Sequence, residues 1–244
     1  MSTHPLEIEF IGHACYRIWE NGKATVMTDP YTHSDLGMED DGVTFEAETV
    51  IISSAIDLSH NNYKLAGPNA KVINALEVSV GKVEAVINGE NVIAIPVTEN
   101  PLHPTGPDDN GMYAFKAGGL WFCHIGDLGH ALDEEALKPW LDKCDVLLAI
   151  TGEVFSLTLE ELDPMIDFLK PKYVFPMHYH IPPGGEKMLP ISEFLNRRPE
   201  DPVLVVNDTK IALPLPEMKA GHPTIVVLRP AGWELVKKQL TYSY

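Results

Sequence analysis

Four short polar segments of this chain carry residues that could bind a metal ion, and each segment ends an apolar run of strand length. Asp57 and His60 follow VIISSA, His103 follows VIAIPVTENPL, Asp127 closes LWFCHIGD and His178 closes YVFPMH. Loops at the edge of a sheet present functional side chains from a rigid scaffold. Imidazole and carboxylate groups suit Zn²⁺, Mn²⁺ or Fe²⁺. We therefore expect a divalent metal site at one sheet edge.

The remaining histidines lie in different surroundings. His13 follows a Gly in FIGHACYRI and is expected as a hydrogen-bonded turn residue or at the rim of the site. His124 lies inside WFCHIGD, where a core or supporting histidine is expected. His180 lies two residues after His178, so on an extended segment it would face the same side as a ligand or general acid; the alternative is a loop histidine on the rim. Four histidines in polar or Pro/Gly-flanked segments are expected at the surface: His4, His33, His130 and His222.

Composition excludes several classes of function. The 244 residues include 35 Asp plus Glu against 18 Lys plus Arg, a formal net charge of −17, which repels nucleic acids and anionic membranes. Cys15, Cys123 and Cys144 form no CxxC pair and are typical of reduced thiols in a cytosolic protein. No signal peptide or membrane-spanning run is recognisable, so we expect a soluble, cytoplasmic chain.

The hydrophobic pattern predicts the elements that must position these residues. Strand-length apolar runs fill the first half, with Asn88-Gly89 and Ala117-Gly118-Gly119 as hairpin turns. Later, DEEALKPWLDKC and TLEELDPMIDFLK predict amphipathic helices, the second with a Thr158…Glu161 capping box, between the buried strands DVLLAIT, YVFPMHY and PVLVVND. We expect two sheets flanked by helices in one domain, residues 1–244.

The order of the segments resembles the metallo-β-lactamase superfamily. The pieces that carry the resemblance are FIGHACYRI, VMTDPY, VIISS…SHNN, His103, HIGDLGH and CDVLLAITG…LKPKYVFPMHY, roughly Ile8 to Tyr179. The most similar branch is the small metal-dependent hydrolases that include the L-ascorbate-6-phosphate lactonases. The resemblance implies an α/β fold, a four-layer αββα sandwich with a dinuclear metal site at the sheet edge. It also implies that Asp29, in MTDPY, supports the site rather than binding metal.

The family's His-x-His-x-Asp-His motif is degenerate in this sequence. Aligned on the segment SHNN, the four motif positions fall on Ala55, Asp57, Ser59 and His60. One histidine is kept, another is exchanged for aspartate, and the first histidine and the motif aspartate are lost. Ala55 cannot bind a metal, and Ser59 is a poor ligand.

The resemblance therefore implies a reduced set of metal ligands. The first site keeps Asp57 and His103, with Asp127 shared between the two sites. The second keeps His60, Asp127 and His178, which suffice for one metal with open positions for water and substrate. We expect one ion per chain rather than two, with Zn²⁺ favoured over Mn²⁺ or Fe²⁺.

Two functions from different classes fit this ligand set. The first is a metal-dependent hydrolase of a small-molecule ester, lactone, amide or phosphoester, with Asp57, Asp127 and His180 as catalytic residues. The second is a non-catalytic relative that binds a ligand or partner through the cleft that holds the active site in other family members. Thiol chemistry at Cys15 or Cys123 is a third alternative. The family also favours a homo-oligomer.

Overall fold

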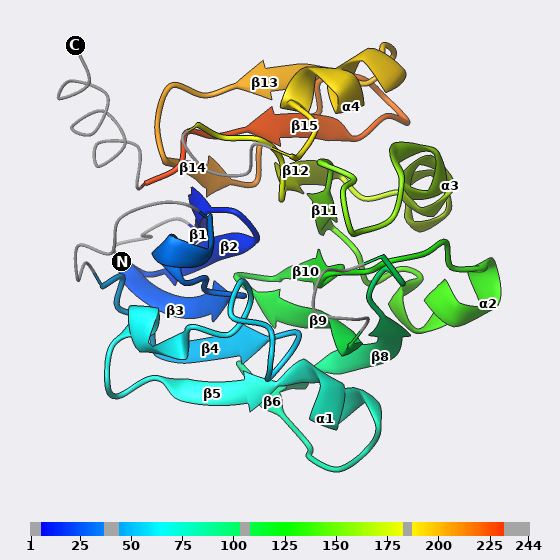
Figure 1. Cartoon of the computed structure of the whole chain (residues 1–244). Coiled ribbons are helices and arrows are strands. Elements are labelled where there is room, and N and C mark those ends of the chain that lie inside the picture. The colour runs from blue at the N-terminus through cyan, green and yellow to red at the C-terminus, as the bar shows by residue number, and fades with distance from the viewer. Residues whose placement is uncertain (1–5, 37–43, 103–107, 183–186, 232–244) are drawn as a thin grey trace, which may run out of the picture.

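The computed structural model describes residues 6–36, 44–102, 108–182 and 187–231 (Figure 1). Fifteen strands lie in these ranges, and all but two of them form two large sheets. The short pair β6 (Val86–Ile87) and β7 (Glu90–Asn91) makes a separate hairpin. Its turn is the predicted Asn88-Gly89, with both residues at positive φ.

The first sheet has six strands in the order β14-β1-β2-β3-β4-β5. Its strands are β1 (Leu6–Gly12), β2 (Cys15–Glu20), β3 (Lys23–Thr28), β4 (Thr49–Ile52), β5 (Lys71–Asn74) and β14 (Lys210–Leu213). β1, β2 and β3 form an antiparallel meander, whereas β3, β4 and β5 are parallel. The carboxyl ends of β3 and β4 therefore meet at the same edge of the sheet.

The second sheet has seven strands in the order β13-β15-β12-β11-β10-β9-β8. Its strands are β8 (Ile93–Thr98), β9 (Asp109–Ala117), β10 (Leu120–His124), β11 (Val146–Ile150), β12 (Tyr173–Met177), β13 (Val203–Val205) and β15 (Thr224–Val227). β9 and β10 are joined through the predicted Gly118-Gly119 turn. The five neighbouring strands β10, β11, β12, β15 and β13 run parallel. β11 and β12 are buried along their whole length, as their continuous apolar sequences predict.

One apolar core lies between the sheets, and polar contacts cross it. Phe10 and Tyr16 of the first sheet stack at 4.8 Å, and Tyr16 meets Phe175 of the second sheet edge to face. The Tyr16 hydroxyl donates to the carbonyl of Pro176 at 2.7 Å. Figure 1 shows the first sheet, mostly blue to cyan, beside the second, mostly green to orange. The two-sheet sandwich and the α/β class are thus confirmed.

The helices differ in part from the prediction. α3 (Leu159–Leu169) begins at the predicted capping box of Thr158 and Glu161. The predicted helix over residues 133–144 is instead α2 (Glu134–Leu137) followed by the 3₁₀ turn η3 (Lys138–Trp140), because Pro139 interrupts the α-helical hydrogen bonds. The other helical segments are η1 (His33–Leu36), η2 (Tyr63–Ala66), α1 (Ala75–Ser79) and α4 (Ile191–Arg197). Within the described ranges, no helix has the length and apolar character needed to cross a membrane.

The two sheets are fixed to each other where strands from both of them end. The backbone N–H of His178, after β12, donates to the carbonyl of His13, after β1.

Gly126, after β10, has a φ of +61°, and a Cβ there would lie 2.2 Å from Oδ1 of Asn110 on β9. Only glycine satisfies both constraints, so the segment that leads into Asp127 can approach β9 closely.

We predict that Gly126→Ala destabilises the protein by more than a positive φ alone explains. The left-handed conformation costs an L-residue roughly 1–2 kcal/mol, and overpacking adds about 1–3 kcal/mol. Gly89→Ala is the matched control, because Gly89 has a φ of +81° and a Cβ added there would meet no atom within 4 Å. Chemical denaturation of both variants checks this, and equal losses of stability would contradict the close packing at Gly126.

Candidate metal centre

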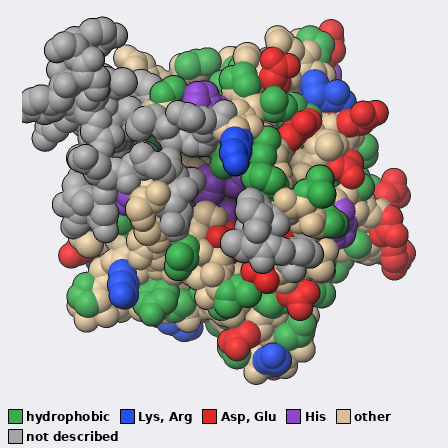
Figure 2. Space-filling view, viewed as in Figure 1, with side chains coloured by type: hydrophobic (Ala, Val, Ile, Leu, Met, Phe, Trp, Pro, Cys, Tyr) green, Lys and Arg blue, Asp and Glu red, His purple; other side chains and the backbone are tan. Residues whose placement is uncertain are grey.

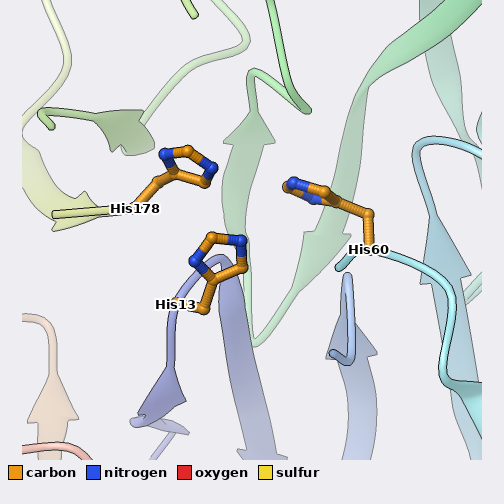
Figure 3. Close-up of side chains that lie close together, drawn as sticks. All are labelled: His13, His60 and His178. Atoms are coloured by element: carbon orange, nitrogen blue, oxygen red, sulfur yellow. The ribbon is translucent and has the colours of Figure 1, made fainter. Parts of the chain in front are cut away.

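Three histidines converge at the junction of the two sheets (Figure 3). His13 lies in the turn between β1 and β2, His60 in the loop after β4, and His178 directly after β12. The ring centroids are 4.2 Å apart for His13 and His178, 5.2 Å for His13 and His60, and 5.7 Å for His60 and His178. All three residues are buried, at most 5 % exposed, so three separate chain segments bring imidazoles together.

The turns that present these residues are conformationally unusual. His13, Asp29 and His178 all have positive φ, at 52°, 34° and 54°. Such values are uncommon for residues other than glycine and cluster at functional sites. Gly12 precedes His13 with a φ of +143°, and a Cβ on it would lie 2.6 Å from the Tyr31 hydroxyl. The strand ends are therefore built to turn these side chains inward.

Asp29 fixes the orientation of His60. Its Oδ2 lies 2.9 Å from Nδ1 of His60, while the Ser53 backbone N–H and the Tyr113 hydroxyl donate to its Oδ1, both at 2.9 Å. The Ser53 hydroxyl donates to Oδ2 as well. A carboxylate in this position keeps the proton of the imidazole on Nδ1 and leaves Nε2 as the metal-binding nitrogen. The sequence-based role of Asp29 as a supporting residue agrees with this geometry.

Two carboxylates face the same nitrogen. Nε2 of His60 lies 3.7 Å from Oδ2 of Asp57 and 3.8 Å from Oδ2 of Asp127. The other oxygen of Asp127 lies 3.9 Å from Nε2 of His178. Asp57 accepts from the backbone N–H and the hydroxyl of Ser59 through its Oδ1, which directs Oδ2 toward His60. Figure 2 shows histidine side chains with acidic ones beside them at the centre of this face.

The electrostatics of the site favour a positive charge. Burial by itself lowers the pKa of His60, but the hydrogen bond to Asp29 and the charges of Asp57 and Asp127 outweigh burial and raise that pKa to about 10. Burial and the neighbouring imidazoles of His178 and His60 hold the pKa of His13 well below its usual value, so His13 is a neutral donor. Burial and the charge of Asp57 raise the pKa of Glu99, which follows β8, to about 7. A cation at this point would relieve the repulsion among the carboxylates.

The donor atoms fit a small divalent ion. Among the described residues, two groups bring their donor atoms within 4.8 Å of one another, and they share His60: the first adds His13 and His178, the second Asp57 and Asp127. Nε2 of His13 and Nε2 of His60 are buried and have no hydrogen-bond partner among the described residues. Ligand atoms about 2.0–2.1 Å from Zn²⁺ lie about 3.3 Å apart at the tetrahedral angle. The contacts of 3.7–3.9 Å need only a small contraction to reach that spacing.

Comparisons with known proteins agree on one family. A family described as "Beta-lactamase superfamily domain" matches residues 7–178. A UPF0173 metal-dependent hydrolase of Nanoarchaeum equitans is 30% identical over 72% of this chain and 84% of its own length. A UPF0173 metal-dependent hydrolase of Methanosphaera stadtmanae is 22% identical over 75% of this chain and 87% of its own length.

The chain belongs to the metallo-β-lactamase superfamily. The fold agrees with that of solved members. A superfamily protein of Thermotoga maritima superposes with a TM-score of 0.63 at 23% identity, covering 91% of this chain and 98% of the other. The metallo hydrolase Igni18 of Ignicoccus hospitalis gives a TM-score of 0.58 at 18% identity, covering 92% and 95%.

The structure brings together most of the ligands predicted from the metallo-β-lactamase resemblance. Asp57, His60 and Asp127 form one of the two donor groups, and His178 joins His60 in the other. His103 lies outside the described residues. His180 belongs to neither donor group, because the positive φ of His178 ends the extended alternation that would have placed both rings on the same side. Its catalytic role stays a prediction.

His13 was not selected from the sequence as a candidate ligand, but the structure places it in one of the two donor groups. His13 follows a strand end, which is the same criterion that selected the other ligands, and the Gly before it marks the turn that directs it inward. His33 was predicted at the surface, but it is only 4% exposed and its ring lies 5.1 Å from that of Tyr31. The prediction failed because residues 30–33 pack against the motif loop, where Thr32 N–H donates to the Leu58 carbonyl.

The remaining candidates are structural. His124 accepts from the Gly126 N–H through Nδ1 and donates from Nε2 to the Ala14 carbonyl, which makes it the supporting core residue that was predicted. Cys15 and Cys123 are fully buried, and burial raises the pKa of both thiols well above the usual range. Thiolate chemistry at either residue is therefore disfavoured.

We predict that His13→Ala and His60→Ala each abolish retention of metal by the purified protein. Either change removes a nitrogen from a site whose ligands come from three separate segments. His130→Ala is the control, because His130 belongs to neither donor group of the described residues and its Nδ1 lies 2.9 Å from the neighbouring Ala131 carbonyl. Elemental analysis measures the outcome, and full metal content in His13→Ala would exclude this residue as a ligand.

Asp29→Asn is expected to weaken metal binding by about 10- to 100-fold while leaving every ligand in place. Loss of a carboxylate behind a metal-binding imidazole has effects of this size. Competition with a chelator of known affinity measures the change. If Asp29→Asn binds metal as tightly as the parent, the hydrogen bond between Asp29 and His60 does not contribute to the metal affinity.

Proposed function

We propose that this protein is a single-metal hydrolase that cleaves an ester, lactone, amide or phosphoester bond of a small molecule. The observation that carries the proposal is that both donor groups share His60, whose Nε2 lies 3.7 Å from Asp57 and 3.8 Å from Asp127. Nδ1 of that ring is held by Asp29, so His60 can bind only one ion at a time. Relatives named metal-dependent hydrolases support the reaction class.

The composition of the ligand set favours Zn²⁺. His13, His60 and His178 supply three imidazoles, and Asp127 lies beside two of them. Sets of three protein ligands with an open position are typical of catalytic zinc, although Mn²⁺ and Fe²⁺ also accept imidazole and carboxylate. When bound, such an ion supplies Lewis acidity toward water and toward the substrate oxygen.

The residues around the ligands have distinct tasks in this proposal. Asp29 holds the His60 ring in one orientation. Ser59, at the position of the family's motif aspartate, holds Asp57 instead through two hydrogen bonds. The remaining oxygen of Asp57 faces the centre and can accept a proton from an attacking water. Asp57 thereby takes over the orienting role that Ser59 lacks the charge to perform.

The test of the function is metal-dependent hydrolysis by the purified chain. We expect p-nitrophenyl esters, lactones or p-nitrophenyl phosphate to be hydrolysed by the metal-loaded protein, with loss of activity after chelation and recovery with Zn²⁺. His60→Ala should lack this activity, whereas His130→Ala should keep it. A fully metal-loaded protein inactive on every class would favour the non-catalytic alternative, a binding protein that uses the same cleft.

We further predict that the double variant Ala55→His, Ser59→Asp raises metal content from one toward two ions per chain. The change restores the two family ligands that are lost at these positions, so by the family alignment the first site gains an imidazole in addition to its predicted ligands Asp57 and His103. Ala55 is exposed, so a larger side chain there does not overpack the core. The single variant Ser59→Asp is the control and should stay near one ion. A folded double variant with unchanged metal content would contradict the alignment of this loop with the family motif.

A further inference from the structure

A pocket lies at the carboxyl ends of three neighbouring parallel strands of the second sheet. The strands are β12, β15 and β13, which are adjacent in the second sheet. The segments that follow them line a pocket of about 560 Å³, with Tyr179 and His180 after β12, Asn207 after β13 and Arg229 after β15. We call it the His180–Arg229 pocket. It begins one residue after the metal-binding His178, because Tyr179 forms part of its wall.

The chemistry of this pocket differs from that of the rest of the chain. Acidic residues outnumber basic ones by 35 to 18 over the sequence, and carboxylates surround the metal centre. No acidic residue is among the described residues that line the His180–Arg229 pocket, which offers a guanidinium, an imidazole, an amide and a phenol against an apolar wall of Ile181, Leu228 and two prolines. Asp208, next to Asn207, is not a lining residue, and its carboxylate accepts from the Thr209 N–H.

The polar groups of the pocket are arranged as donors. Arg229 donates from Nη1 to Oδ1 of Asn207 at 3.2 Å, and its backbone N–H donates to the Asp208 carbonyl, so the side chain and backbone are both anchored. With its oxygen engaged, the Asn207 amide has its NH₂ group to offer to a ligand. Burial raises the pKa of Tyr179 to about 12, so its hydroxyl keeps its proton at neutral pH.

We propose that the His180–Arg229 pocket binds an oxyanion, carboxylate or phosphate, at the end of the substrate away from the bond that is cleaved. A planar guanidinium beside an amide NH₂ is suited to the paired oxygens of either group. The apolar wall would contact the carbon skeleton that joins the anion to the reacting bond. The statement that the anion belongs to the substrate rests on the proposed function; binding of an anion in the pocket does not.

The test is a titration of the zinc-loaded protein with inorganic phosphate and, separately, with acetate, followed by the ¹H–¹³C signals of the His180 ring. At least one anion should shift these signals saturably. Arg229→Met should weaken the apparent affinity about tenfold or more, as expected for loss of a charged hydrogen-bond donor. Arg229→Lys should retain part of the affinity. Arg197→Met is the matched control, since Arg197 is not among the described residues that line the pocket, and it should bind like the parent.

Some outcomes of the titration identify the class of anion, and others contradict the proposal. Saturation by phosphate alone assigns a phosphoryl group, and saturation by acetate alone assigns a carboxylate. No saturable shift with either anion, or equal affinity in Arg229→Met and the parent with unchanged melting temperatures, overturns the proposal. The titration is repeated with His60→Ala, which is expected to hold no metal. Retained binding there places the anion in the pocket, whereas loss of the His180 shift would place it on the metal and overturn the proposal.

Discussion

The hydrogen bond between Asp29 and Nδ1 of His60 is the interaction on which both the fold and the site depend. Both side chains are fully buried. An ionised carboxylate without partners in such a place would be very costly. Asp29 is stable there because Ser53, directly after β4 of the first sheet, Tyr113 of the second sheet and His60 all contact it. The same contacts that satisfy its charge hold the two sheets together and direct the His60 ring.

The strained turns at the sheet edge follow from this arrangement. His13, Asp29 and His178 have positive φ, and each costs conformational free energy of order 1–3 kcal/mol. Hydrogen bonds and packing around them compensate, as in the bond from the His178 N–H to the His13 carbonyl, which joins the two sheets. A metal bound by residues on these turns would tie the same segments together, so metal binding and the stability of this edge are coupled.

Much of the fold was predictable because the hydrophobic periodicity of strands and helices and the residue types of turns can be recognised in the local sequence. The capping box at Thr158, the Asn88-Gly89 turn and the buried apolar runs of β11 and β12 appear in the structure as the sequence indicates. The last strands, β14 and β15, were not predicted. β14 is a short strand at the sheet edge, and its pairing with β1 is set by residues about 200 positions away. Such long-range pairing leaves little trace in the local sequence.

The candidate site was predictable where a residue able to bind metal directly follows a strand. It was not predictable where tertiary packing determines the burial or direction of a side chain. Asp57, His60, Asp127 and His178 were found from their position after apolar runs. His33 was misjudged because the polarity of its neighbours carried no information about the loop that buries it. The placement of His180 depended on the φ of His178, which no residue type other than glycine reveals from sequence. His13 also follows a strand end, but it was expected as a hydrogen-bonded turn residue or at the rim of the site.

We propose that one metal ion is held mainly by His13, His60 and His178, because Asp29 engages Nδ1 of His60 and leaves only Nε2 for a metal. Zinc K-edge X-ray absorption of the metal-loaded protein tests it most directly, since this measurement reports the ligand types and any neighbouring metal. We expect one zinc per chain, scattering from three imidazoles with the remaining ligands oxygen, and no metal–metal distance. A metal–metal distance, or a first coordination shell with a single imidazole, would contradict it.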